Sequence, residues 1–287
     1  MPAPTVSVTF DNLGEASEFE RGTWPEGQPL GEHFSVREAL PQLLGMLAAE
    51  DIRATFFVEG LNGELYPDAL AGLAAAGHEV ACHGWRHEEW AELNAGRERE
   101  LLARAHAALG APTGFRPPGG DLTASSAGLL TELGFTYCSP AGEGTERRGD
   151  LAVLPFRWPL LDAYHYLPHF AALRQANGDP EKPMPAAALR DAVLGALAAH
   201  ARGDGHLVLL FHPSCCRRSP TRCPSSPRCS RTSASSRAPA PCAACAWTRP
   251  PWPCSARTGP RARASPKRAP TRARPVRSDP PPTRPPP

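Results

Sequence analysis

His83 and His87 have the spacing of two ligands for one metal ion. They lie four positions apart in the stretch Cys82-His83-Gly84-Trp85-Arg86-His87, directly after the apolar run Glu79-Val80-Ala81. On a helix, side chains four positions apart share one face, and neutral imidazole is a common ligand of zinc-like ions. The pair therefore predicts a metal site on a helix, although two surface histidines would show the same spacing. Polar residues elsewhere in the chain have to distinguish the two readings.

The elements that would position such a site alternate between strand and helix. Apolar runs predict strands at 5–10, 53–58, 78–82, 113–116, 135–138, 151–156 and 205–211. Helical spacing predicts helices at 35–48, 67–76, 92–109, 125–133 and 186–201, with Ser35 and Glu38 as a capping box for the first. This alternation predicts an α/β fold with a parallel sheet, either doubly wound or closed as a barrel.

Candidate chemical groups follow several of these strands. Asp11-Asn12, His83, Arg116 and His212 each come just past the end of an expected strand. In parallel α/β folds, the carboxyl ends of the strands share one face, where sites are built. We therefore expect these side chains to form one site.

Charge and composition divide the chain near Ser214. Residues 1–214 hold 15 Lys and Arg against 28 Asp and Glu, a net charge of −13, whereas residues 215–287 hold 16 against one, a net charge of +15. The second segment also contains 18 of the 35 prolines and no Ile, Leu or Phe. We predict a folded α/β domain at 1–214, which the resemblance described below implies to be a barrel, and a disordered tail at 215–287, since the tail lacks the residues to pack a core.

The tail has two interpretations. Its basic runs are typical of an arm that binds nucleic acid. Its abundance of Arg, Pro, Ala, Ser and Cys, with an abrupt start, favours instead a translation out of frame of a GC-rich gene, so nucleic acid is not the expected partner. Conceptual translation of the other two frames should then restore an amphipathic helix.

The beginning of the chain predicts a cytoplasmic location. Residues 5–10 alternate like a strand and lack the charged start and apolar core of a signal peptide, and no apolar stretch reaches the length of a membrane span. Only Cys82 and Cys138 precede the tail, which suits a reducing compartment. No membrane partner is expected, and the sequence does not indicate an oligomeric state.

Five segments, taken in order, resemble the polysaccharide deacetylase (NodB-homology) superfamily. They are Thr9-Phe10-Asp11-Asn12, Ala54-Thr55-Phe56-Phe57-Val58, His83-Gly84-Trp85-Arg86-His87, Phe115-Arg116-Pro117-Pro118-Gly119-Gly120 and Leu207-Val208-Leu209-Leu210-Phe211-His212. The resemblance covers residues 5–213. It implies an irregular (β/α) barrel of about seven strands and hydrolysis of a carbon–nitrogen bond, most often removal of an N-acetyl group from a sugar.

The resemblance also implies roles. His83, His87 and Asn12 would hold a divalent metal, most often zinc, with Asp11 as general base and His212 as general acid. Arg116 would pair with Asp11, Asp162 would orient His212, and the Gly119 N–H would stabilise an oxyanion. Trp85 is expected either at the cleft wall, in contact with substrate, or in the packing beside it.

The chain departs from the family pattern at two places. Asn12 stands where the family has a metal-binding Asp, so metal affinity should fall or the metal be absent, unless Glu15 or Asp121 supplies the carboxylate. Gly84-Trp85-Arg86 is similar to the allantoinase-like branch, which opens small cyclic amides. Three functions therefore stay open: metal-dependent deacetylation of an N-acetylated carbohydrate, hydrolysis of a small cyclic amide with or without metal, and a catalytically degenerate barrel.

Overall fold

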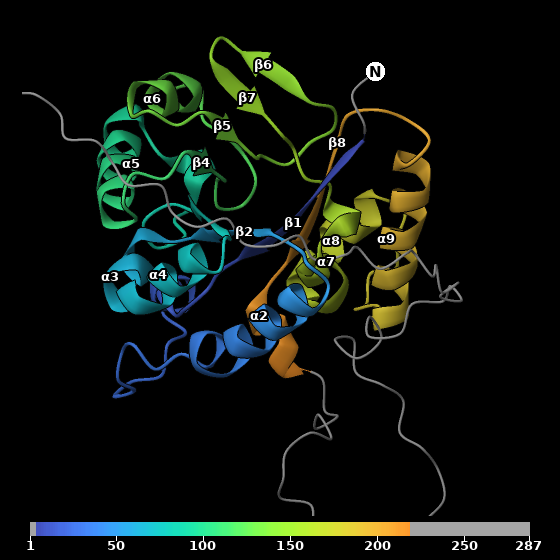
Figure 1. The fold of residues 1–287 in the computed structure, drawn as a ribbon, viewed down its shortest axis with the longest axis horizontal. Helices are drawn as coiled ribbons and strands as arrows, with labels where there is room; N and C mark the ends of the chain where they lie inside the picture. The colour runs from blue at the N-terminus through green and yellow to red at the C-terminus, as the bar shows by residue number, and fades with distance from the viewer. Residues whose placement is uncertain (1–3, 219–287) are drawn as a thin grey trace, which may run out of the picture. The chain divides into compact units, whose positions relative to one another are not determined.

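The fold is built on one curled sheet whose strands are mostly parallel (Figure 1). The computed structural model describes residues 4–218. Within them the sheet has eight strands in the order β6-β7-β5-β4-β3-β2-β1-β8. The strands are β1 (Thr5–Asp11), β2 (Ala54–Val58), β3 (Glu79–Cys82), β4 (Gly114–Phe115), β5 (Tyr137–Cys138), β6 (Glu146–Arg148), β7 (Leu151–Val153) and β8 (His206–Phe211).

Seven of these strands run parallel, as the sequence predicts, and β6 pairs antiparallel with β7. The expected irregular (β/α) barrel is confirmed as a half-barrel, a sheet that curls and leaves β6 and β8 as its outer strands. A single bridge between Leu161 and Leu210 adds one further contact to β8.

Helices cover the outer side of the sheet, and short ones fill the connections. The helices are α1 (Ala16–Glu20), α2 (Leu40–Ala49), α3 (Gly60–Leu65), α4 (Pro67–Ala75), α5 (Ala95–Ala108), α6 (Ser126–Glu132), α7 (Asp162–Tyr166), α8 (Ala171–Ala176) and α9 (Ala186–His200). A π-helix, Ser35–Ala39, precedes α2, and 3₁₀ turns lie at Trp90–Glu92, Trp158–Leu160, Pro168–Phe170 and Pro213–Arg218. In residues 4–218, no helix has the length and apolar character that crossing a membrane requires.

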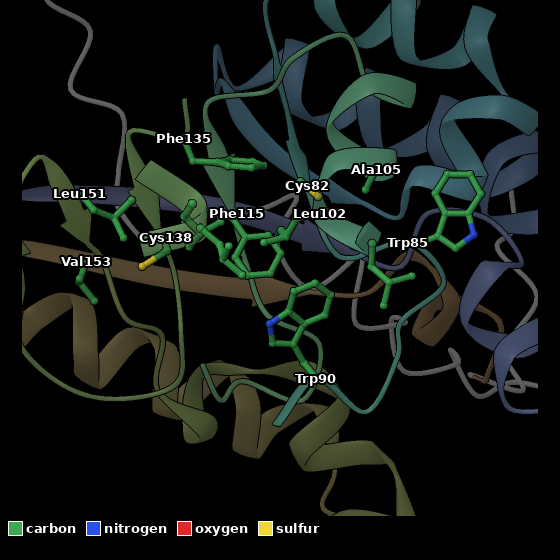
Figure 2. Close-up of a cluster of buried hydrophobic side chains, with 13 residues drawn as sticks. Cys82, Trp85, Trp90, Leu102, Ala105, Phe115, Phe135, Cys138, Leu151 and Val153 are labelled. Atoms are coloured by element: carbon green, nitrogen blue, oxygen red, sulfur yellow. The ribbon is translucent and has the colours of Figure 1, made fainter. Parts of the chain in front are cut away.

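The two faces of the sheet carry different side chains. On the outer face, Phe10 stacks on Phe56 with ring centroids 4.9 Å apart, in a cluster with residues of α2 and α4. A second cluster joins α5 and α6 to β3, β4, β5 and β7, and contains Cys82, Trp85 and Phe115 (Figure 2). Because strand residues alternate between faces, Thr9, Asp11 and Phe57 point the other way, into the interior. The interior is therefore where polar residues gather.

The segment between β7 and α9 folds around one buried arginine. Arg174 is fully buried, and its guanidinium donates hydrogen bonds to the carbonyls of Tyr164, Leu167, Pro180 and Glu181 at 2.5–3.2 Å. These bonds fix α7, which begins at Asp162. The sequence predicted only an irregular excursion here.

One expectation is corrected. Ser35 does not cap a helix: its hydroxyl accepts from the Gly14 N–H at 2.9 Å and pairs with His33, and the helix that follows has no side-chain cap. Residues 215–218, at the start of the predicted tail, lie in the 3₁₀ turn Pro213–Arg218. The rest of the predicted tail, and with it the nucleic-acid and frame-shift interpretations, lies outside the described residues.

Candidate active site

A buried ion pair joins the ends of β1 and β4. Arg116 Nη1 donates to Asp11 Oδ1 at 2.7 Å and to Thr9 Oγ1 at 3.0 Å, while Nη2 donates to Ser139 Oγ at 3.0 Å. Asp11 is 3% exposed and Arg116 1%. The guanidinium also lies 4.0 Å from the ring centroid of Phe57. Two predicted residues, 105 positions apart in sequence, thus meet in the interior of the half-barrel.

The two predicted ligand histidines approach each other from a loop and not from a helix. Strand β3 ends at Cys82, and residues 83–87 form turns in which Gly84 and His87 both have a φ of +74°. Glu88 stabilises the loop because its carboxylate accepts from the N–H groups of Trp85 and Arg86, each at 3.0 Å. The rings of His83 and His87 nevertheless lie 5.0 Å apart, centroid to centroid.

His83 presents one ring nitrogen to the site. Its Nδ1 donates to the Arg116 carbonyl at 2.9 Å, and a carbonyl fixes the tautomer because it only accepts. The other nitrogen, Nε2, lies 3.8 Å from Asp11 Oδ2. Burial, with a smaller contribution from the nearby charge of Arg116, lowers the pKa of His83 to about 3. The ring is therefore neutral, and the lone pair of its Nε2 can bind a cation.

His87 is also held neutral. Burial, then the charges of His83 and Arg21, lower the pKa of His87 well below its ordinary value. Arg21 approaches it directly, with Nη2 3.4 Å from His87 Nδ1. This guanidinium, which the sequence did not single out, places a positive charge beside the candidate metal site.

The side-chain oxygen of Asn12 is a candidate metal ligand, because it has no hydrogen-bond partner. Asn12 follows Asp11 with a φ of +58°, and its Oδ1 is buried. An unpartnered amide oxygen and two neutral imidazoles are ligands that suit zinc, although an amide brings no negative charge. The two imidazoles therefore fit a divalent cation, and Asn12 Oδ1 is a candidate third ligand.

The candidate acid lies at the end of β8. His212 Nδ1 donates to Asp162 Oδ1 at 2.7 Å, and the His212 backbone N–H donates to Asp162 Oδ2 at 2.7 Å. Burial lowers the pKa of His212, but the charge and hydrogen bond of Asp162, aided by Asp11, outweigh burial, so the net pKa is raised. Asp11 and His212 are therefore close enough to interact electrostatically. Ligand-type atoms of Asp162, His212 and Cys215 also lie within 4.8 Å of one another, but two of these residues are already bonded together.

The remaining predicted residues differ in position. Gly119 is exposed and has a φ of +76° in the turn after Arg116, where a side chain would meet nothing. Trp85 is 2% exposed and packs in the cluster with Cys82 (Figure 2). Of the two positions expected for Trp85, the structure favours packing over substrate contact.

Neither of the carboxylates suggested in place of the family Asp, Glu15 and Asp121, is placed as a metal ligand. Glu15 is fully buried, but its oxygens accept from the Gly31 N–H at 2.6 Å and the Tyr66 hydroxyl at 2.5 Å. Asp121 is exposed. Sequence reasoning missed Glu59, a fully buried acid directly after β2. The rule that singled out Asp11 and Arg116, a polar residue just past a strand, would have found it.

Comparison with known proteins shows which family the first half of the chain resembles. Residues 1–138 match the family model described as polysaccharide deacetylase. A peptidoglycan-N-acetylglucosamine deacetylase of Bacillus cereus is 29% identical over 103 residues, 34% of this chain and 38% of that protein. A chitin deacetylase of a Pestalotiopsis species is 30% identical over 102 residues, 33% of this chain and 34% of that protein. The matched part therefore spans little more than a third of these relatives.

Solved structures agree over a longer range. A candidate polysaccharide deacetylase from Mycobacterium smegmatis superposes with a TM-score of 0.61 and 28% identity, covering 74% of this chain and 79% of that one. The Puue allantoinase superposes with a TM-score of 0.54 and 20% identity, over 74% and 81%, which shows the shared fold alone. Residues 1–138 thus resemble the polysaccharide deacetylase family in sequence, and the resemblance seen in the motifs is confirmed.

Proposed function

We propose that this protein is a metal-dependent hydrolase that removes the acetyl group from an N-acetylated carbohydrate. The observation that carries the proposal is the buried ion pair of Asp11 and Arg116 beside the neutral rings of His83 and His87. Related proteins named as deacetylases of peptidoglycan and chitin support the class of substrate.

Each polar group has a task that its surroundings favour. A divalent cation on Asn12, His83 and His87 would polarise the acyl oxygen and acidify a water. Asp11 would accept the proton of that water, because Oδ2 faces His83 while Oδ1 is held by Arg116. The N–H of Gly119, an exposed residue, would donate to the oxyanion.

His212 would complete the reaction as general acid. Asp162 binds its Nδ1–H, which leaves Nε2–H to protonate the departing amine. The raised pKa of His212 favours the protonated form that an acid needs. Asp162 is accordingly a positioning residue that acts through His212.

The test is release of acetate from N-acetylchito-oligosaccharides by the purified full-length protein. We expect activity with Zn²⁺, loss with a chelator, recovery on adding Zn²⁺, and loss of both bound metal and activity in His83→Ala. Zinc binding without acetate release from either chitin or peptidoglycan fragments would contradict the proposal.

Asn12 favours a second candidate, hydrolysis of a small cyclic amide without metal. The amide brings no charge to the cation, and Arg21 lies 3.4 Å from His87. Ring opening of a cyclic ureide that persists in chelator would support this alternative. Inactivity on both substrate classes by a folded protein would favour the degenerate barrel.

A further inference from the structure

Glu59 is a buried acid on the same face of the sheet as the candidate metal site. The register of β1, β2 and β3 pairs Phe57 with Asp11 on one side and with Ala81 on the other. Glu59 lies two residues beyond Phe57, and His83 lies two beyond Ala81. Since strand side chains alternate, both project to the interior face at the carboxyl ends.

Two contacts support this orientation. The His83 N–H donates to the Val58 carbonyl at 2.9 Å, which continues the parallel pairing to the level of Glu59. Gly60, the next residue, faces the opposite way, because a Cβ there would meet Trp85 at 2.6 Å and the Cα of Ala105 at 2.7 Å. Glu59 therefore faces inward.

Glu59 has one oxygen with no partner. Its Oε2 accepts from Asn62 Nδ2 at 2.9 Å, and Asn62 is fixed in turn because its Oδ1 accepts from the Ala16 N–H at 3.2 Å. Its Oε1 is buried and has no hydrogen-bond partner. Leaving a buried acceptor unpaired costs about 1–3 kcal/mol, so such an atom calls for an explanation.

Across residues 4–218, the buried side-chain oxygens without a partner are Asn12 Oδ1 and Glu59 Oε1. Each residue directly follows a strand, Asn12 after β1 and Glu59 after β2, and those strands are neighbours. The two unsatisfied oxygens thus stand at the same end of adjacent strands. At this end of the sheet, Asp11 on β1 and His83 after β3 lie on the two sides of Glu59.

The charge of the site points to the same residue. Asn12 and two neutral imidazoles would leave a divalent cation with its full charge, and the Asp11 carboxylate is already paired with Arg116. Glu15 has both oxygens occupied and Asp121 is exposed.

From this placement we infer that Glu59 is the anionic oxygen ligand of the metal site, taking over from the neighbouring strand the charge that Asn12 does not bring. The inference rests on the metal site of the proposed function. On this inference the negative charge that the family has at position 12 is supplied here by Glu59, and the metal site is kept.

The test is the affinity of the full-length protein for Zn²⁺, measured by competition with a chromophoric chelator. Glu59→Gln keeps the shape and an acceptor for Asn62, and we expect it to weaken binding by about 10- to 100-fold or more. The matched control is Glu79→Gln, a carboxyl on the same interior face near the start of β3, bonded to Thr55 at 2.8 Å, which should bind Zn²⁺ as the wild type does.

A rescue variant sharpens the assignment. In Glu59→Gln, adding Asn12→Asp should restore the affinity to within a few-fold of the wild type, because either strand then supplies one carboxylate. Glu59→Met, which has no carboxyl to bury, replaces the Gln variant if that one does not fold, and it should show the same loss.

The outcomes separate the two proposals. Wild-type binding with unchanged affinity in Glu59→Gln and Glu59→Met would overturn the role of Glu59 and leave the proposed function standing. A wild-type protein that binds no Zn²⁺ would contradict the metal site itself, and this assignment with it.

Discussion

Asp11–Arg116 and Asp162–His212 are both pairs of a carboxylate with a cationic side chain. In the proposed mechanism the carboxylate acts in the first pair and the cationic side chain acts in the second. In the first pair the guanidinium keeps its proton at any working pH, so it can only hold the carboxylate in place. In the second pair the imidazole can give up its proton, so the carboxylate holds the cation in place. In the proposed mechanism, the member of each buried pair that acts is therefore the one that can exchange a proton.

The largest effect is expected from Asp11→Asn, which removes the acting member of the first pair. Loss of a general base lowers kcat by about 10²- to 10⁴-fold. The change also leaves the Arg116 charge buried without a partner, and breaking a buried pair costs about 3–5 kcal/mol of folding stability. Acetate release and denaturant unfolding measure the two effects. Near-normal kcat in a folded variant would remove Asp11 from the mechanism.

A smaller and more specific effect is expected from Asp162→Asn, which changes the holding member of the second pair. Asp162 raises the pKa of His212 against burial, so without its charge the pKa falls. His212 would then lose its proton at lower pH, and the alkaline limb of kcat/KM would move to lower pH. The pH profile of acetate release measures this shift. An alkaline limb that stays in place while the rate drops would assign Asp162 a purely structural role.

The smallest effect is expected from Arg21→Ala, which touches neither pair. Arg21 places a positive charge 3.4 Å from His87 Nδ1 at the surface of the site. Removing an exposed charge of this kind is worth about 0.2–1 kcal/mol, so Zn²⁺ affinity should rise by up to about 5-fold, and less at high salt. Chelator competition at low and high ionic strength measures the change, and a weaker affinity in the variant would show that Arg21 supports the site.

Much of the fold and part of the site could be predicted, because strand ends mark both. The alternation of strands and helices gave the parallel sheet, and Asp11, His83, Arg116 and His212 lie where its strands end. Their convergence follows from topology alone. The roles given to them remain predictions that the experiments above address.

Local geometry could not be predicted where long-range contacts decide it. The histidine loop is not helical, because Glu88 binds two of its N–H groups and Gly84 takes a left-handed conformation. Trp85 turns into the core because Gly60 leaves room for its ring. Spacing alone carries no information on either contact.

Asp162 shows the same limit on a larger scale. It lies in a segment without hydrophobic periodicity, and its position depends on a bridge from Leu161 to Leu210 and on the carbonyls gathered by Arg174. None of these contacts has a signature in a single sequence. The resemblance to the family was therefore needed to suggest Asp162 at all.

Arg174 has a consequence for how this part of the protein can diverge. Its partners are backbone carbonyls, which nearly every amino acid supplies equally well. The side chains between Tyr164 and Glu181 can therefore be exchanged widely while the loop keeps its path and Asp162 its place. New side chains can therefore face a substrate from that loop, provided that Arg174 is kept.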